Sequence, residues 1–166
     1  MKYSSKRILI GIEDSQSSTH ALEYVADLAR DSGSFAIHVF HAVGPVPVEM
    51  REFGGAENTK TERQLDSQLH QKRDHWIRTA KTEAHPLLEN AKLKLGAMGI
   101  PKSALTTHLV VLQDRQEFIS EIFKTASQNR CGTIVVGQSH FPWFKELFTP
   151  HTGEELLKQS EGSVFV

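Results

Sequence analysis

This sequence of 166 residues has a single cysteine, no long hydrophobic run and almost no net charge. Cys131 is the only cysteine, so no intrachain disulfide can form, and we expect a cytoplasmic protein. No apolar run approaches the roughly 18 residues of a membrane-spanning helix, and residues 1–7 lead into a strand pattern instead of a signal peptide. The net charge of -1 gives no broad attraction to nucleic acids or acidic membranes.

Motifs for metal binding and nucleophilic catalysis are also missing. The nine histidines are scattered over different segments, and no H-x-x-x-H, C-x-x-C or carboxylate pattern joins them, so we predict no metal site. A nucleophile elbow of the form G-x-S-x-G is absent, and Ser139 and His140 are merely adjacent on one loop, which cannot supply a triad. We therefore expect a protein that is not an enzyme.

Short apolar runs alternate with helical patterns along the chain. The predicted strands are residues 8–12, 35–41, 105–112, 133–136 and 164–166. This alternation predicts a single α/β domain over residues 1–166, with an open, mainly parallel five-stranded sheet and helices on both faces. An enlarged segment at about 44–98 holds a loop and a long helix, whose apolar pattern runs from Leu65 to Leu95.

Local signals predict how several elements begin and end. Ser15 or Ser17 can cap the first helix, and residues 114–117 (DRQE) fit a capping box in outline. Pro86 lacks an N–H and should kink or split the long helix just before it. The stretch 44–60 has glycines and prolines but no periodicity, so we expect an exposed, mobile loop there.

Polar or small residues follow two of the predicted strands. Glu13 and Asp14 come after the first strand, and Gly137 comes after the fourth. Ligands of parallel α/β sheets bind beyond the carboxyl ends of the strands, so these residues share a crevice if the two strands are neighbours. The carboxylates could bind a ribose hydroxyl or an amine there, or could instead cap the first helix, whose dipole favours negative charge.

Three stretches of the chain resemble the universal stress protein family. They are residues 8–15 (ILIGIEDS) with residues 21–24 behind them, residues 133–137 (TIVVG) and residues 164–166 (VFV). The resemblance covers nearly the whole chain. It implies an adenine nucleotide α-hydrolase-like sheet of strand order 3-2-1-4-5, a role in the stress response, and a homodimer that often forms through the last strand.

Family members that bind ATP or AMP carry G-x2-G-x9-G-[ST] after strand four, where glycines let backbone N–H groups approach the phosphates. In this sequence Gly137 matches the first position, but His140, Pro150 and His151 occupy the other three. Residues 13–14 also place Glu-Asp where the family usually has Asp-Gly. The sequence thus resembles the kind that lacks the ATP-binding motif, and we expect no cofactor.

A variant phosphate loop that binds ATP or AMP is the alternative. The base would then lie against the end of strand two, and the phosphates would contact the loop after strand four. The candidate crevice positions are Glu13, Asp14, Ala42, Val43, Gly137, Gln138, Ser139, His140, His151 and Thr152. The two histidines of this set could contact a phosphate when protonated.

The segment 141–148 is rich in aromatic residues. It is interpreted as a plug over the crevice, as a surface for a protein partner, or as a stacking platform for adenine. The leading hypothesis is a stress-response protein that acts through homodimerisation and protein contacts, with this segment and the long helix as candidate surfaces. Cys131 is interpreted as a lone buried thiol, with a redox sensor as the alternative.

Overall fold

The computed structural model describes residues 4–32, 35–51, 59–114, 116–137 and 163–165. The elements in chain order are β1 (Ser4–Gly11), α1 (Gln16–Ser32), β2 (Ala36–Val43), the 3-10 helix η1 (Val48–Met50), α2 (Thr59–Ala97), the 3-10 helix η2 (Lys102–Ala104), β3 (Leu105–Val111), α3 (Glu117–Gln128), β4 (Cys131–Val136) and β5 (Ser163–Phe165). In this part of the chain the strands form one parallel sheet in the order β3-β2-β1-β4-β5. The predicted α/β class and strand order are confirmed.

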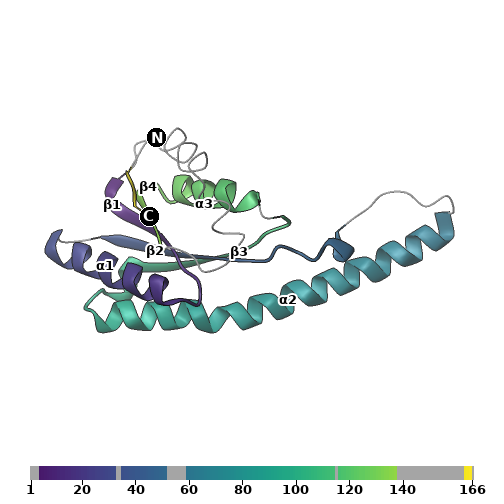
Figure 1. Cartoon of the computed structure of the whole chain (residues 1–166), viewed down its shortest axis with the longest axis horizontal. Coiled ribbons are helices and arrows are strands. Elements are labelled where there is room, and N and C mark those ends of the chain that lie inside the picture. The colour runs from purple at the N-terminus through teal and green to yellow at the C-terminus, as the bar shows by residue number, and fades with distance from the viewer. Residues whose placement is uncertain (1–3, 33–34, 52–58, 115, 138–162, 166) are drawn as a thin grey trace.

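Helices cover both faces of this sheet, with α1 and α2 on one face and α3 on the other (Figure 1). Successive residues of a strand point to opposite faces. Accordingly, Ile8 and Ile10 of β1 pack with α1 and α2, whereas Leu9 packs with α3. A strand that is buried on both faces needs a continuous apolar run, which is why β1 shows no alternating pattern in the sequence.

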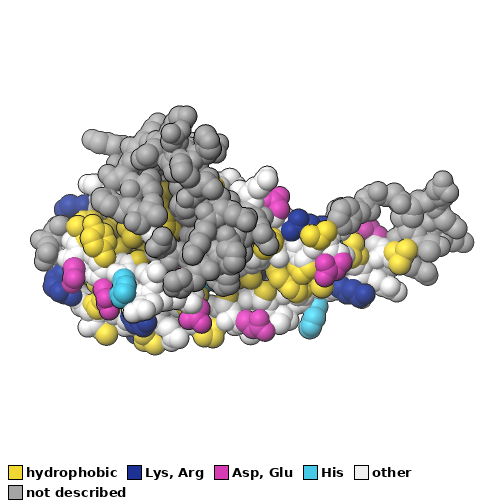
Figure 2. Space-filling model, in the orientation of Figure 1, with side chains coloured by type: hydrophobic (Ala, Val, Ile, Leu, Met, Phe, Trp, Pro, Cys, Tyr) yellow, Lys and Arg dark blue, Asp and Glu magenta, His cyan; other side chains and the backbone are white. Residues whose placement is uncertain are grey.

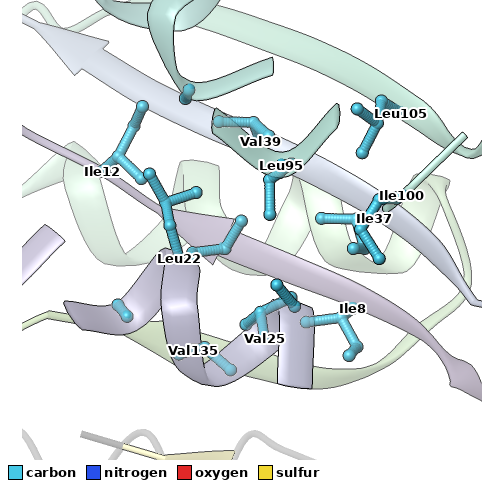
Figure 3. Packing of buried hydrophobic residues seen from close by; sticks show 14 of the residues in the cluster. Ile8, Ile12, Leu22, Val25, Ile37, Val39, Leu95, Ile100, Leu105 and Val135 are labelled. Carbon is cyan, nitrogen blue, oxygen red and sulfur yellow. The ribbon is translucent and has the colours of Figure 1, made fainter. Parts of the chain in front are cut away.

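The larger apolar cluster joins the sheet to α1 and α2 (Figure 3). Val25 of α1, Leu95 of α2, and Ile37 and Val39 of β2 are completely buried in it. Burying a side chain of this size stabilises the fold by about 1.5–3 kcal/mol. The cluster fixes both helices on the sheet and thereby positions the residues at the carboxyl ends of the strands.

The helix α2 is much longer than the sheet that it covers. It contains 39 residues, which span about 58 Å at 1.5 Å per residue, whereas an eight-residue strand spans about 26 Å. Its N-terminal part therefore extends far beyond the sheet (Figure 1). Hydrophobic side chains are interspersed with acidic and basic ones along this extension (Figure 2). The C-terminal part of α2 packs on the sheet through Ala80, Ala84, Leu88, Ala91 and Leu95.

The helix α2 continues through Pro86, so the predicted split of the long helix is wrong. Pro86 is exposed, and so is Thr82 one turn earlier. The carbonyl of Thr82, which loses its helical N–H partner to the proline, can therefore bond water. Ala84 and Leu88 are buried in the core on either side of the proline, and their burial offsets the missing hydrogen bond.

Residues 44–47 form the predicted loop, but the expectation that the whole stretch 44–60 is an exposed loop is wrong in two places. Val46 is completely buried, and its N–H donates to the carbonyl of Leu112 over 2.9 Å. The turn η1 follows, and α2 begins at Thr59, earlier than the apolar pattern from Leu65 indicated. Residues 52–58 lie outside the described part of the chain.

The predicted caps form, with one change of partner. Ser15 Oγ accepts the N–H of Ser18 over 3.2 Å in the first turn of α1. Before α3, Asp114 Oδ1 accepts the N–H of Glu117 over 3.1 Å, and Glu117 Oε2 accepts the N–H of Gln113 over 2.6 Å. The carboxylate of Glu117 therefore reaches one residue further upstream than a standard capping box requires.

Several predicted features lie outside the described residues. They include the aromatic segment 141–148, the helix expected before the last strand, and Val166. The extent of a single domain over residues 1–166 stays a prediction.

Candidate functional site

The carboxyl ends of β1, β2 and β4 meet at one edge of the sheet. Gly11 of β1 is in register with Phe40 of β2 and with Val136 of β4. A cavity of about 50 Å³ lies beyond these positions. Its described lining residues are Gly11, Ile12, Glu13, Ser18, Phe40, His41, Ala42, Phe118, Val136 and Gly137. Glu13 and Gly137 thus share a crevice, as the sequence led us to expect, while their role in binding stays a prediction.

Gly137 brings the end of β4 into close contact with the first turn of α1. A Cβ atom at Gly137 would lie 2.9 Å from the carbonyl carbon and oxygen of Ser17 and 3.1 Å from the nitrogen of Ser18. Real Cβ atoms essentially never approach backbone atoms to under 3.0 Å. Packing between the two elements therefore explains a glycine at this position without any phosphate.

Hydroxyl groups already bond the backbone at the start of α1. The N–H of Glu13 donates to Ser18 Oγ over 2.8 Å, and the N–H of Ser18 donates to Ser15 Oγ over 3.2 Å. Helix N-termini bind anions through N–H groups that lack such partners. Both of these N–H groups are therefore engaged within the chain.

His41, at the end of β2, is held in one tautomer. Its Nδ1 atom lies 2.8 Å from the carbonyl oxygen of Ile12. Since a carbonyl oxygen can only accept, Nδ1 carries the hydrogen and Nε2 of the neutral ring is an acceptor. Burial lowers the pKa of His41, although the bond to Ile12 and the nearby Glu13 act in the opposite direction. The ring is consequently neutral near pH 7.

A larger hollow, which we call the α2 groove, lies between α2 and the ends of β1 and β2. Its volume is about 580 Å³, within the range of about 300–1,000 Å³ that is usual for small-molecule sites. Its described lining residues are Glu13, Asp14, His41, Val43, Trp76, Thr79, Ala80, Glu83, Ala84, Pro86, Leu87 and Asn90. Three of these residues carry a carboxylate, and none of them is a lysine or an arginine.

The structure brings five of the ten predicted site residues to this edge of the sheet. Ala42 lines the small cavity, Asp14 and Val43 line the α2 groove, Glu13 lines both, and Gly137 lines the small cavity. The remaining five, Gln138, Ser139, His140, His151 and Thr152, lie outside the described residues.

Sequence reasoning missed most residues of the α2 groove, among them His41, Trp76 and Glu83. Trp76 and Glu83 are seven positions apart, so two turns of helix place them on the same face. That signal was present in the sequence. The sequence does not show which part of the sheet this helix face lies against.

A second pair of histidines lies on neighbouring strands. His38 Nδ1 is 3.3 Å from His108 Nε2 and 2.6 Å from Thr106 Oγ1, while the buried Nε2 of His38 has no hydrogen-bond partner in the described structure. Burial, followed by the charges of His108 and Arg7, lowers the pKa of His38 to about 4. Neither histidine is among the described residues that line the crevice or the α2 groove.

Cys131 is the first residue of β4 and is 4% exposed. Burial raises the pKa of its thiol to about 12. The interpretation as a buried thiol is confirmed. A thiol with such a pKa is almost entirely protonated at neutral pH, and the protonated form is not the nucleophile.

Two kinds of feature are absent from the described residues. No helix in this part of the chain is long and apolar enough to cross a membrane. Within the same residues, no three histidine, cysteine or acidic side chains gather as a metal-binding group.

Comparison with solved structures shows the fold. A universal stress family protein from Burkholderia pseudomallei has a TM-score of 0.61 at 18% identity, covering 97% of this chain and 94% of that one. UspA from Lactobacillus plantarum has a TM-score of 0.61 at 15% identity, with 100% and 98% covered. The universal stress protein from Archaeoglobus fulgidus in complex with dAMP has a TM-score of 0.57 at 18% identity, with 96% and 94% covered.

A search of curated proteins finds no significant match. The sequence model of the Universal stress protein family, by contrast, matches residues 4–166. This match spans nearly the whole chain and agrees with the strand order β3-β2-β1-β4-β5. The chain therefore belongs to the universal stress protein family.

Proposed function

We propose that this protein acts in the stress response as a cytoplasmic homodimer that makes protein contacts, without binding ATP and without catalysing a reaction. The observation that carries this proposal is the chemistry of the crevice. Glu13 lines the crevice and the α2 groove, and Asp14 lines the groove; among the described residues that line these two hollows, none is a lysine or an arginine. Lys94 lines a neighbouring cavity together with Glu13 and Asp14. Phosphates are bound by hydrogen-bond donors and positive charge, and the described residues at this edge of the sheet supply few of either.

Two further features support the same proposal. The described cavity between Gly11 and Gly137 holds about 50 Å³, which suits a few water molecules. The glycine that would approach a phosphate, Gly137, is required by its contact with Ser17 and Ser18. Its presence is therefore no argument for nucleotide binding.

The direct test is to denature freshly purified protein and to separate any released nucleotide by chromatography. We expect no ATP or AMP peak, and no thermal shift when millimolar ATP and Mg²⁺ are added. A ligand at about 100 times its Kd would stabilise the fold by roughly 2.7 kcal/mol, which a melting curve resolves. A stoichiometric nucleotide peak would refute the proposal.

The proposed homodimer forms through the free edge of β5. Among the described strands, β5 ends the sheet and pairs only with β4, and an unpaired strand edge is a template for another chain. The N–H groups of successive strand residues point to opposite edges. Of the variants Val164→Pro and Phe165→Pro, one should therefore lose an N–H on the outer edge and the other an N–H facing β4.

Light scattering coupled to size exclusion would measure the oligomeric state of the two variants. We expect the wild-type chain to be a dimer and one of the two proline variants to be a folded monomer. A monomeric wild-type chain, or two variants that both stay dimeric, would contradict dimerisation through β5.

An ATP- or AMP-binding stress sensor is the second candidate function. It is favoured by two solved structures of similar fold, a universal stress protein from Archaeoglobus fulgidus in complex with dAMP and a universal stress protein in complex with cAMP. The base would lie near Ala42 and Val43, which the structure places beside the crevice. The nucleotide-release experiment distinguishes the two candidates directly.

A further inference from the structure

We propose that the α2 groove binds an alkylammonium group, that is, a primary amine at the end of an alkyl chain. This inference goes beyond the proposed function and does not depend on it. The groove lies against α2, whereas the family's phosphate motif follows β4. The groove has a volume of about 580 Å³, which is large enough for a ligand of that shape.

The polar wall of the α2 groove consists mainly of hydrogen-bond acceptors. Asp14 and Glu83 are exposed carboxylates that reach the groove from opposite sides, one from the end of β1 and one from α2. His41 adds the acceptor Nε2, because its Nδ1–H is bonded to the carbonyl of Ile12. An ammonium group has three donors and no acceptor, so it is complementary to this wall, and an anion is not.

The other wall of the groove is apolar and aromatic. Val43, Ala80, Ala84 and Leu87 supply aliphatic surface, and the half-buried Trp76 supplies an indole ring. Apolar surface of this kind accommodates a chain of methylene groups. The face of a tryptophan ring also attracts a cation. An amine on an alkyl chain matches both walls at once.

The positive charges nearby do not cancel the acidic wall. Lys94 lines a small cavity that shares Glu13 and Asp14 with the α2 groove, and its Nζ donates to Thr19 Oγ1 over 3.2 Å. Arg73 donates to the side chain of Gln113 over 2.8 Å. Neither is among the described residues that line the α2 groove, and Glu83 lines it without lining the Lys94 cavity.

The test is isothermal titration of the full chain with cadaverine, beside 1,5-pentanediol as a neutral ligand of similar length. We expect cadaverine to bind and the diol not to bind. The affinity for cadaverine should fall as salt is raised from about 0.05 to about 0.5 M, because salt screens the attraction between the ammonium group and the carboxylates. Glu83→Gln should weaken cadaverine by about five- to tenfold, as expected for loss of one charge-assisted contact. Glu23→Gln, which removes an exposed carboxylate of α1, should leave the affinity unchanged.

A second variant tests the aromatic wall. Trp76→Leu keeps an apolar side chain and removes the ring, so we expect a loss of about two- to fivefold. Circular dichroism would confirm that each variant is folded. Equal affinity of the wild type and Glu83→Gln, or equal binding of the diol and cadaverine, would overturn the proposal.

The amine can be a free small molecule or a lysine side chain of another protein. A short peptide with one internal lysine, and the same peptide with norleucine in its place, separate the two sources. Stronger binding of the lysine peptide than of cadaverine assigns the groove to a protein partner, and the reverse assigns it to a soluble amine. If neither cadaverine nor the lysine peptide binds, the proposal is wrong.

Discussion

Replacing Gly137 by alanine tests whether the end of β4 is held against α1 as closely as the structure shows. The added Cβ would lie 2.9 Å from the backbone of Ser17 and 3.1 Å from the nitrogen of Ser18. These are backbone atoms of the first helical turn, which Ser15 helps to fix, so no side-chain rotation can relieve the contact. Either α1 or the end of β4 must move by a few tenths of an ångström.

The expected size of the effect follows from two opposing contributions. Overpacking of a close contact costs about 1–3 kcal/mol, and the reduced freedom of the unfolded chain returns about 0.4–1 kcal/mol. We expect Gly137→Ala to lower the free energy of unfolding by about 1–2 kcal/mol. Gly96→Ala is the matched control, because a Cβ there has no atom within 4 Å and the residue lies in α2. It should stabilise by up to about 1 kcal/mol.

Urea denaturation followed by circular dichroism measures both free energies of unfolding. The two variants carry the same chemical change, so their difference of about 2 kcal/mol reports the environment alone. It corresponds to roughly 4–8 °C in melting temperature for a chain of this size. If Gly137→Ala were as stable as Gly96→Ala, the close approach would be refuted, and another reason for the glycine would be needed.

Three further predictions concern the core and the buried titratable groups. Leu95→Ala should lower the free energy of unfolding, measured by urea denaturation, by about 2–5 kcal/mol because Leu95 is completely buried. Leu93→Ala, at a position 64% exposed, should change it by less than about 0.5 kcal/mol, and similar losses for the two variants would contradict the orientation of α2. Cys131 should not react with a thiol reagent at pH 8 until the chain unfolds, since burial raises its pKa to about 12, and rapid labelling of native protein would disprove its burial. The pKa of His38 falls from 6.5 to about 4 on folding, so the unfolded chain binds more protons between these values. His38 should therefore lower the free energy of unfolding by about 2–3 kcal/mol as pH falls through this window. His38→Gln should reduce the pH dependence of stability without removing it, because burial lowers the pKa of His41 and of His108 as well; the exposed His20→Gln should preserve the dependence, and a slope that His38→Gln leaves unchanged would argue against this assignment.

Much of the fold could be predicted because the strands are buried on both faces. Residues 8–12 and 133–136 are continuous apolar runs, which in an alternating α/β chain indicate a parallel sheet. The start of β1 was missed because Ser5, Lys6 and Arg7 are exposed and carry no hydrophobic signal. For the same reason the first turn of α2 was missed, since Thr59 precedes any apolar periodicity.

Pro86 shows where local rules stop being sufficient. A proline inside a helix removes one hydrogen bond, and the sequence alone predicted a kink or a split. The helix continues because Ala84 and Leu88 are anchored in the core on either side of the proline. Tertiary packing of this kind decides most helix stability, and it is not visible in a window of neighbouring residues.

The candidate site could likewise be predicted only in part from the sequence. Glu13 and Gly137 could be placed together from the sequence, because the resemblance to the family implied that the first and fourth strands are neighbours. The α2 groove could not, because its shape depends on how α2 is rotated and shifted against the ends of β1 and β2. Trp76 and Glu83 were recognisable as one helix face, and only the fold brings that face to Asp14.

The chemistry of this edge of the sheet follows from which of its groups are already bonded. The N–H groups of Glu13 and Ser18 donate to serine hydroxyls, and Nδ1–H of His41 donates to a backbone carbonyl. Each of these bonds removes a donor that an anion would need. The carboxylates and Nε2 of His41 are acceptors, and their residues line a groove without a described lysine or arginine. The described part of this edge therefore complements a ligand that brings donors and positive charge, as the proposed alkylammonium group does.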